Sequence, residues 1–226
     1  MSQKSRKGRW TSFLRYGIAA AAVLAALPLF MSFGPVNSFS VTMQAIAKGG
    51  ATTGEGTGTI TYYMAPGMMR MDLAADTAPS GPASQGSSIL LFQKDQVVNI
   101  VLVPSEKKYL ETTMTRQEYE ADPSNFDAMF AQPDSDGGFC HETSTVECKN
   151  IGSDTLAGQR VQKWTLTTKN SDGTTDTGTV WYDAQLHFVL QALNKDGSGF
   201  VVKNVSTTTP AASLFEVPSD YSKLTY

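Results

Sequence analysis

The stretch VWYDAQLHFVLQALNKDGSGFVVKNV, residues 180–205, predicts three antiparallel strands in a row. Polar breaks at 183–185 and 195–199 separate runs of apolar and β-branched residues, and none of these runs has a helical period. A meander of this kind leaves one apolar face and two edges uncovered, because three strands bury little surface by themselves. We therefore expect most of the remaining sequence to supply neighbouring strands and a cover for that face.

Seven further segments before the meander have the alternating pattern of strands, which makes about ten strands in all. They lie at residues 57–64, 68–73, 89–92, 96–103, 107–112, 149–152 and 160–169. Residues 41–58 are small and polar and predict a flexible approach, and residues 74–86 predict an exposed loop. The run 97–103 is apolar on both faces, so we expect it to be covered twice, by the core and by a lid, a second sheet or a ligand.

The only helical signals lie between residues 115 and 131. Thr115 and Glu118 have the spacing of a capping box, and Asp122 followed by Pro123 has the pattern of a second helix start. The two short helices would share an apolar underside. That underside either packs on the core or forms a movable cover over a cavity; its residues are Tyr119, Phe126, Met129 and Phe130.

The first forty residues have the composition of a secretory signal. A basic segment with five Lys and Arg precedes an apolar run at 18–33, and small residues follow it. The run is shorter than the roughly 20 residues that span a bilayer as a helix. We expect a signal peptide at 1–40, cut after Ser40, and one periplasmic domain at 41–226; the alternative is an uncleaved anchor in the inner membrane.

Charge and cysteines narrow the class of protein further. Without residues 1–40 the chain keeps 13 Lys and Arg against 21 Asp and Glu, a net charge of −8, which argues against a nucleic-acid partner. Cys140 and Cys148 are the only cysteines. In an exported protein they predict one disulfide, which would contribute about 2–3 kcal/mol. The alternative, a metal site with His141, lacks a fourth ligand.

Catalytic motifs are absent from the sequence. There is no G-x-S-x-G, phosphate loop, dinucleotide fingerprint or H-E-x-x-H, and only His141 and His187 could act as a base. His187 lies between two apolar residues of an expected strand, which favours a structural role. We therefore expect a protein that is not an enzyme and that has no cofactor and no metal.

Four methionines within eight residues stand out: Met64, Met68, Met69 and Met71. Methionine is flexible and polarisable, so the cluster could pack in the core, line an apolar pocket or bind Cu(I). Alternation along the strands places the four on two faces, which opposes a single copper site. Arg70 lies among them, either at an edge or surface position, or as a fixed cation at a pocket rim or a partner for a lid carboxylate such as Glu118 or Asp122.

Several segments, in this order, resemble the bacterial lipoprotein-sorting carriers of the LolA-like superfamily. They are YYMAPGMMRMDL at 62–73, the hairpin at 89–112, the short helices, the stretch 152–164, GTVWYD at 178–183, and LFEVP at 214–218 with Tyr221. The resemblance implies an incomplete antiparallel barrel whose short helices cover the concave face over a cavity for acyl chains. In these carriers a strand arginine after a proline helps to hold the lid, and Pro66 and Arg70 match that pattern.

We therefore expect a mainly β (α+β) fold, an incomplete antiparallel β-barrel with short helices on its concave face. The expected function is to bind or carry a lipid or other apolar ligand in the periplasm, with lipoprotein trafficking as one form of it. Envelope lipoproteins and transient membrane contact are the expected partners. The alternative is a non-catalytic structural or assembly factor of the cell envelope. The expected ligand-binding residues are Met64, Met68, Arg70, Tyr119, Phe126, Met129 and Phe130.

Overall fold

The computed structural model describes residues 37–49, 59–74, 85–121, 145–170 and 172–225. These residues form one sheet of twelve strands. The strands are β1 (Phe39–Ile46), β2 (Thr59–Ala65), β3 (Met68–Ala74), β4 (Gln85–Phe92), β5 (Gln96–Val103), β6 (Lys108–Thr115), β7 (Val146–Leu156), β8 (Gln159–Lys169), β9 (Thr175–Asp183), β10 (Phe188–Asn194), β11 (Gly199–Ser206) and β12 (Ser222–Lys223). Helix is confined, in this part of the chain, to α1 (Arg116–Ala121) and the 3-10 turns η3 (Pro104–Glu106) and η5 (Ala212–Phe215).

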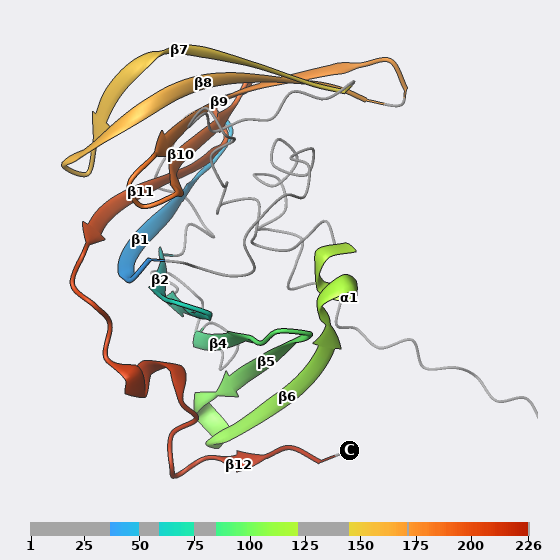
Figure 1. Ribbon diagram of the computed structural model, residues 1–226, viewed down its shortest axis with the longest axis vertical. Helices are drawn as coiled ribbons and strands as arrows, with labels where there is room; N and C mark the ends of the chain where they lie inside the picture. Colours follow the sequence, from blue (N-terminus) through green and yellow to red (C-terminus); the bar gives the residue numbers. More distant parts are fainter. Residues whose placement is uncertain (1–36, 50–58, 75–84, 122–144, 171, 226) are drawn as a thin grey trace, which may run out of the picture.

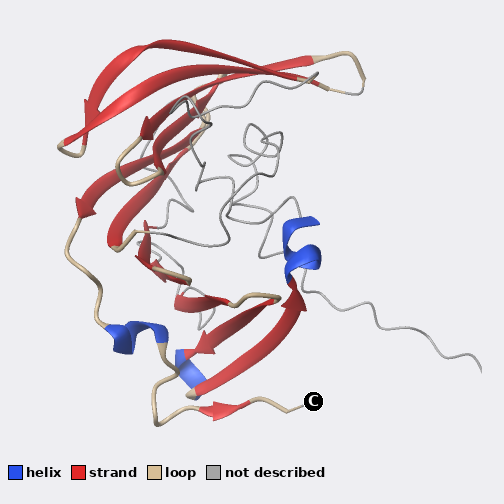
Figure 2. Ribbon diagram, viewed as in Figure 1, coloured by secondary structure: helices blue, strands red, loops and turns tan. Residues whose placement is uncertain are grey.

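The sheet is open and curved. Its strand order is β12-β6-β5-β4-β3-β2-β1-β11-β10-β9-β8-β7, and every pair is antiparallel except β12 with β6. Figure 1 shows the strands following an arc whose two ends, β7 and β12, do not meet. Figure 2 shows how little helix accompanies them. The mainly β antiparallel prediction is confirmed, and the incomplete barrel that was expected with about ten strands is an open sheet of twelve in the described residues.

Strand β1 contradicts the prediction of a flexible approach for residues 41–46, while residues 50–58 lie outside the described residues. It lies in the middle of the sheet between β2 and β11. Its sequence FSVTMQAI alternates apolar and polar residues, and Phe39, Val41 and Met43 are buried. The pattern was missed because the expected signal cut after Ser40 divides it. Phe39 therefore belongs to the central strand, although the signal prediction placed it in the leader.

The meander is present as β9, β10 and β11, but two of its details were predicted wrongly. His187 lies in the turn before β10 with a φ of 54°, and not on a strand. The register of β10 against β9 shifts between Val189 and Gln191. Such a bulge inserts an extra residue and breaks simple alternation. Val189 pairs with Tyr182 and Gln191 pairs with Trp181, which are neighbours on β9 and point to opposite faces, whereas the sequence placed Val189 and Gln191 on one face. Phe188, Val189 and Leu190 are all fully buried.

The two faces of the sheet are covered by different parts of the chain. Figure 1 shows α1 on the open, concave side and the turn η5 on the outer, convex side. On the convex side Phe215 of η5 packs with a buried cluster from β2, β4 and β5; the buried strand residues are Ala65, Ile89, Ile100 and Leu102. A larger cluster includes buried side chains of the central strands, among them Phe39, Val41, Tyr62, Met64 and Met69.

Strands β7 and β8 form a long hairpin at one edge of the sheet. Cys148 lies on β7 and takes part in a disulfide. Its predicted partner Cys140 lies outside the described residues, so the pairing stays a prediction. Also outside the described residues are His141, the second predicted helix with Phe126, Met129 and Phe130, and most of the signal segment. In the described part of the chain, no helix has the length and hydrophobicity needed to cross a membrane.

Candidate functional site

The concave face of β2 to β6 has a regular arrangement of side chains. Directly paired residues of antiparallel strands point to the same face, so each row of partners forms a rung across the sheet. One rung contains Tyr62, Met71, Ser88, Val101 and Leu110. The next rung toward α1 contains Met64, Met69, Leu90, Asn99 and Thr112. Beyond it lie Phe92, Val97 and Met114, and on the other side lie Ile60, Leu73 and Gly86.

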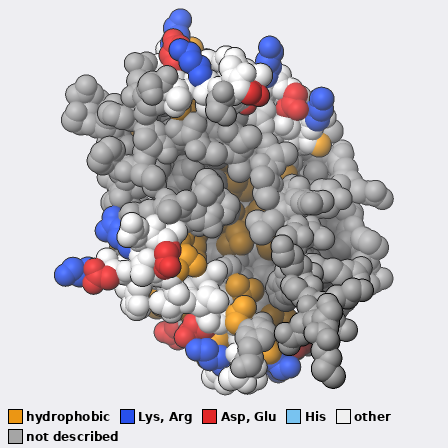
Figure 3. Space-filling model, turned by 90° about the vertical axis from the view of Figure 1, so that its right-hand side faces the viewer, with side chains coloured by type: hydrophobic (Ala, Val, Ile, Leu, Met, Phe, Trp, Pro, Cys, Tyr) orange, Lys and Arg blue, Asp and Glu red, His pale blue; other side chains and the backbone are white. Residues whose placement is uncertain are grey.

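Burial changes along these rungs. Tyr62 and Met64 of β2 are fully buried, whereas Leu73 is 43% exposed and Val101 is 38% exposed. We define the apolar wall as six of the half-buried and exposed apolar side chains of this face: Met71, Leu73, Leu90, Val101, Leu110 and Met114. Figure 3 looks into the open side of the sheet, and hydrophobic side chains gather at the centre of that view.

A glycine lies next to the most exposed part of the apolar wall. Gly86 pairs with Leu73, and a Cβ placed on Gly86 would meet no atom of the described residues within 4 Å. Within the described part of the chain, no atom therefore covers this position between β3 and β5, and the apolar wall borders it.

Three polar side chains interrupt the apolar wall, and we call them the polar row: Ser88, Asn99 and Thr112. The Ser88 hydroxyl donates a hydrogen bond of 2.9 Å to Asn99 Oδ1. Asn99 and Thr112 are direct cross-strand partners. Ser88 and Asn99 are half-buried and Thr112 is exposed.

Helix α1 packs against the same face at the end of β6. The Tyr119 ring meets Phe92 edge to face, with ring centroids 5.5 Å apart, and Tyr119 is 2% exposed. The predicted capping box is confirmed, since Glu118 N–H donates to Thr115 Oγ1 and Thr115 N–H donates to the Glu118 carboxylate. The Thr115 N–H and the Thr115 hydroxyl both donate to the Glu118 carboxylate, and these two bonds lower the pKa of the Glu118 carboxyl.

Arg70 lies on the opposite, convex face. Its side chain is 16% exposed and binds Asp72 at 2.7 Å, the Leu214 carbonyl at 3.0 Å and the Ser87 hydroxyl at 3.3 Å. The alternative in which Arg70 pairs with Glu118 is not formed, because Glu118 caps α1 on the other side of the sheet. Asp122 lies outside the described residues. Arg70 instead ties the C-terminal segment to β3 and β4.

The methionine cluster is divided as the alternation predicted. Met64 and Met69 are buried with the central cluster and Met71 packs against it, whereas Met68 packs with the convex cluster. The seven expected ligand residues are therefore not one constellation. Met64 and Tyr119 lie on the concave side, Met68 and Arg70 lie on the convex side, and the other three are outside the described residues.

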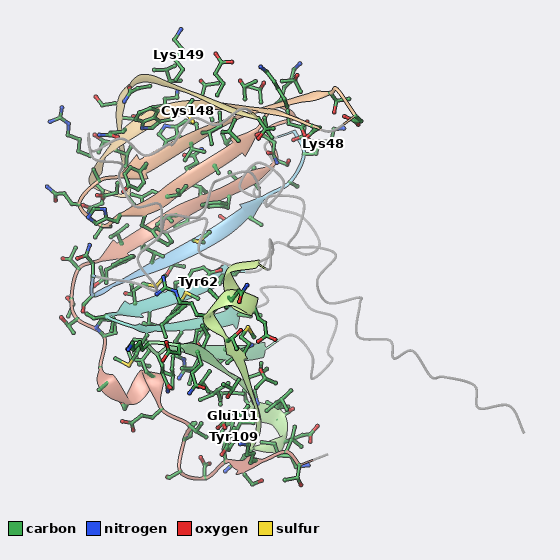
Figure 4. All side chains as sticks on the ribbon, turned by 45° about the vertical axis from the view of Figure 1, so that its right-hand side comes forward. Lys48, Tyr62, Tyr109, Glu111, Cys148 and Lys149 are labelled. Carbon is green, nitrogen blue, oxygen red and sulfur yellow. The ribbon has the colours of Figure 1, made fainter. Side chains whose placement is uncertain are left out.

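The remaining polar chemistry is structural. Tyr182 Oη lies 3.2 Å from His187 Nδ1, and burial raises the pKa of Tyr182. Asp183 is buried and accepts hydrogen bonds from the backbone of the following turn. Within the described ranges, no group of three or more His, Cys, Asp or Glu side chains is arranged to hold a metal ion. Figure 4 places Tyr62 in the middle of the sheet, between Tyr109 on β6 and Cys148 on β7.

Sequence reasoning found part of the candidate site and missed the rest. The apolar run 97–103 was expected to be covered on both faces. Val98, Ile100 and Leu102 do pack with the convex cluster under the C-terminal segment. Val101 faces the concave side and is exposed. The apolar residues on both faces of the run 97–103 are the sequence feature that could have pointed to the apolar wall. The polar row was missed because its members are distant in sequence.

Comparison with known proteins gives no family. No family model matches this chain, and no curated protein matches it.

Solved structures show a distant similarity. The chain is 14% identical to a structure of MucB in complex with MucA(peri), covering 93% of this chain and 61% of that chain with a TM-score of 0.46. The MucA/MucB complex of Pseudomonas aeruginosa is 12% identical over 93% of this chain and 62% of that chain, with a TM-score of 0.48. A putative outer membrane lipoprotein-sorting protein domain from Vibrio parahaemolyticus is 11% identical over 74% and 67%, with a TM-score of 0.24.

This chain thus spans about three fifths of the MucB chains that it matches. Identities and TM-scores this low do not indicate a function for this chain.

Proposed function

We propose that this protein binds a lipid or another apolar ligand against the concave face of its sheet, over the apolar wall. The observation that carries the proposal is the exposure of this face. The large hydrophobic side chains that are exposed in the described part of the chain are Leu73, Val101 and Ile151, and the first two belong to the apolar wall. Apolar side chains that gather at one exposed place typically mark an interaction site.

The energetics favour an occupant for this face. Leu73 and Val101 lie on neighbouring rungs and are separated by β4, where Gly86 and Ser88 contribute little side-chain volume. Removing apolar surface from water stabilises a complex by about 25 cal/mol per Å². A hydrocarbon chain along the apolar wall would gain this contribution from several side chains at once. Met71 and Met114 add flexible side chains that can adapt to its shape.

The charge distribution supports a ligand without a strong charge. Asp72 and Glu111 belong to the same strands as the apolar wall, but their partners place them on the convex face with Arg70 and the C-terminal segment. Burying an unpaired charge against an apolar surface is costly, so hydrocarbon is the ligand chemistry that this surface accepts best.

We also propose a cellular location and partners for this binding. The basic and apolar pattern of residues 1–33 supports export, so we propose a periplasmic, non-catalytic binding or carrier protein. Its partners would be lipids, or envelope lipoproteins that carry acyl chains, met during transient contact with a membrane. Tyr119, packed on Phe92, would border the ligand from α1, and Phe126, Met129 and Phe130 remain proposed ligand contacts.

Two measurements test the proposal. Protein purified without detergent should yield extractable lipid by mass spectrometry, and it should bind the apolar fluorophore N-phenyl-1-naphthylamine saturably. Val101→Asp should weaken fluorophore binding at least about tenfold, because it places a carboxylate on the apolar wall. Ile151→Asp is the matched control, since it changes an equally exposed hydrophobic residue on β7 and should leave the affinity unchanged.

Two results would refute the proposal. The first is a protein that neither carries lipid nor binds the fluorophore, which would favour the structural or assembly role instead. The second is an affinity that Val101→Asp and Ile151→Asp alter equally, which would mean that the fluorophore binds elsewhere.

A further inference from the structure

The polar row differs in polarity from the apolar surface around it. Ser88, Asn99 and Thr112 come from three successive strands and lie within the apolar wall. Their rung neighbours on the same face are apolar: Met71, Leu90, Val101 and Leu110. A ligand that covers the apolar wall therefore also covers hydrogen-bonding groups. Each of these groups loses its hydrogen bonds to water, which costs free energy unless the ligand supplies hydrogen bonds in their place.

The hydrogen bond within the polar row defines what it can offer to a ligand. Asn99 Oδ1 accepts from the Ser88 hydroxyl at 2.9 Å, so the amide nitrogen is the side of Asn99 left to donate. The Thr112 hydroxyl, directly across on β6, is a second donor and is exposed. Cross-strand partners have Cβ atoms about 5 Å apart, which lets two donors reach one acceptor oxygen.

Charge near the polar row favours a neutral acceptor over an anionic one. Among the described residues of β2 to β6 that point to this face, the one cation is Lys108, which pairs with Val103 at the outer end of β6. Lys108 Nζ already lies 3.1 Å from the Glu106 carboxylate. A phosphate or carboxylate would thus find no uncompensated cation on the described part of the face. A carbonyl oxygen has two lone pairs and no charge, and it matches two neutral donors.

We propose that the polar row binds the ester or amide carbonyl of an acyl lipid, with Asn99 Nδ2 and the Thr112 hydroxyl as donors, while the acyl chain lies along the apolar wall. This inference rests on the proposed function and specifies its ligand class. Ser88 is a positioning residue, because it holds the Asn99 amide in the orientation that presents its nitrogen.

The test compares two lipids that differ only in the carbonyl. Monooleoylglycerol has an ester carbonyl, and 1-O-oleylglycerol has an ether in its place with the same chain and head group. Each displaces N-phenyl-1-naphthylamine from the full chain in a fluorescence titration. One net hydrogen bond changes an affinity roughly threefold to tenfold, so the wild-type protein should prefer the ester by about that factor or more.

The variants assign this preference to named residues. Asn99→Leu and Thr112→Val should each reduce the preference for the ester toward one while the ether still binds. Thr113→Val is the matched control, because Thr113 is the exposed neighbour on the same strand and pairs with Val98 on the convex face. It should keep the wild-type preference. Thr112→Val keeps the shape of the side chain, so it tests the role of the polar row even where Asn99→Leu fails to fold.

The outcomes separate this inference from the proposed function. Equal affinities of the wild-type protein for ester and ether, or a preference that survives in both Asn99→Leu and Thr112→Val, would overturn the role of the polar row and leave apolar binding intact. Failure of the fluorophore and both lipids to bind would overturn the proposed function, and the inference with it.

Discussion

Replacing Phe39 by alanine tests whether the domain begins with β1. The Phe39 side chain is 1% exposed, and its ring meets Phe188 edge to face with centroids 5.5 Å apart. Truncating a buried phenylalanine costs about 3–5 kcal/mol, of which an aromatic pair contributes roughly 0.5–1.5 kcal/mol. A domain of this kind has a total stability of about 5–15 kcal/mol. Phe39→Ala should therefore remove a large part of the stability of the protein.

Urea unfolding followed by tryptophan fluorescence measures this loss in a chain that begins at Asn37. With a slope of roughly 2 kcal/mol per molar urea, the midpoint should fall by about 1.5–2.5 M. A chain that begins at Val41 should lose at least as much, because it also lacks the pairing of Ser40 with Tyr63 and Ser206. Ser40→Ala is the control and should shift the midpoint little.

The opposite result would refute the reasoning. If Phe39→Ala and the chain beginning at Val41 were as stable as the chain beginning at Asn37, the first residues of β1 would not be part of the folded core. A signal cut after Ser40 would then be compatible with the fold. If the expected loss is observed, the cut has to precede Phe39, which N-terminal sequencing of the exported protein would check.

Three further predictions concern backbone strain and charge. Gly199→Ala should destabilise the protein by more than about 2 kcal/mol in urea unfolding, because φ is 153° and a Cβ would overlap the Ala192 carbonyl, whereas Gly86→Ala should be nearly neutral. Ala157→Gly should raise stability by roughly 0.5–1 kcal/mol, because Ala157 holds a φ of 48° in the β7–β8 turn; an unchanged midpoint would contradict this. Hydrogen bonds from a backbone and an indole N–H lower the pKa of Asp154, so its contribution is present above the unfolded pKa of about 3.9 and is lost as pH falls through the folded value. Asp154→Asn should therefore reduce the stability difference between neutral and acidic pH, and equal differences in both proteins would contradict the assignment.

Local features of the chain were predictable because neighbouring residues produce them. Alternation placed Met68 and Met69 on opposite faces, as the structure has them. The capping box of Thr115 and Glu118 starts α1 where its spacing predicts, since the two residues satisfy each other's backbone within one turn. Strand β5 has the predicted bounds, Gln96–Val103.

Features that depend on a partner strand were predicted less well. The bulge of β10 cannot be seen in the sequence, because an extra residue is defined only against the register of β9. The position of β1 in the middle of the sheet also depends on pairing, since β1 pairs with β2, the next strand, and with β11, which lies far away along the chain. Arg70 was expected near α1, but its face and its bonds to Asp72 and Leu214 follow from the return of the C-terminal segment.

The candidate site shows the same division. The residue pattern alone specifies strands with an apolar and a polar side, because side chains alternate along any extended chain. Which side becomes concave and stays exposed depends on where η5 and α1 pack, which is a matter of long-range contacts. The polar row exists only in the folded sheet, since register brings Ser88 beside Asn99 and Asn99 beside Thr112 from three separate strands. Tertiary structure therefore decided which of the many strand residues could meet a ligand.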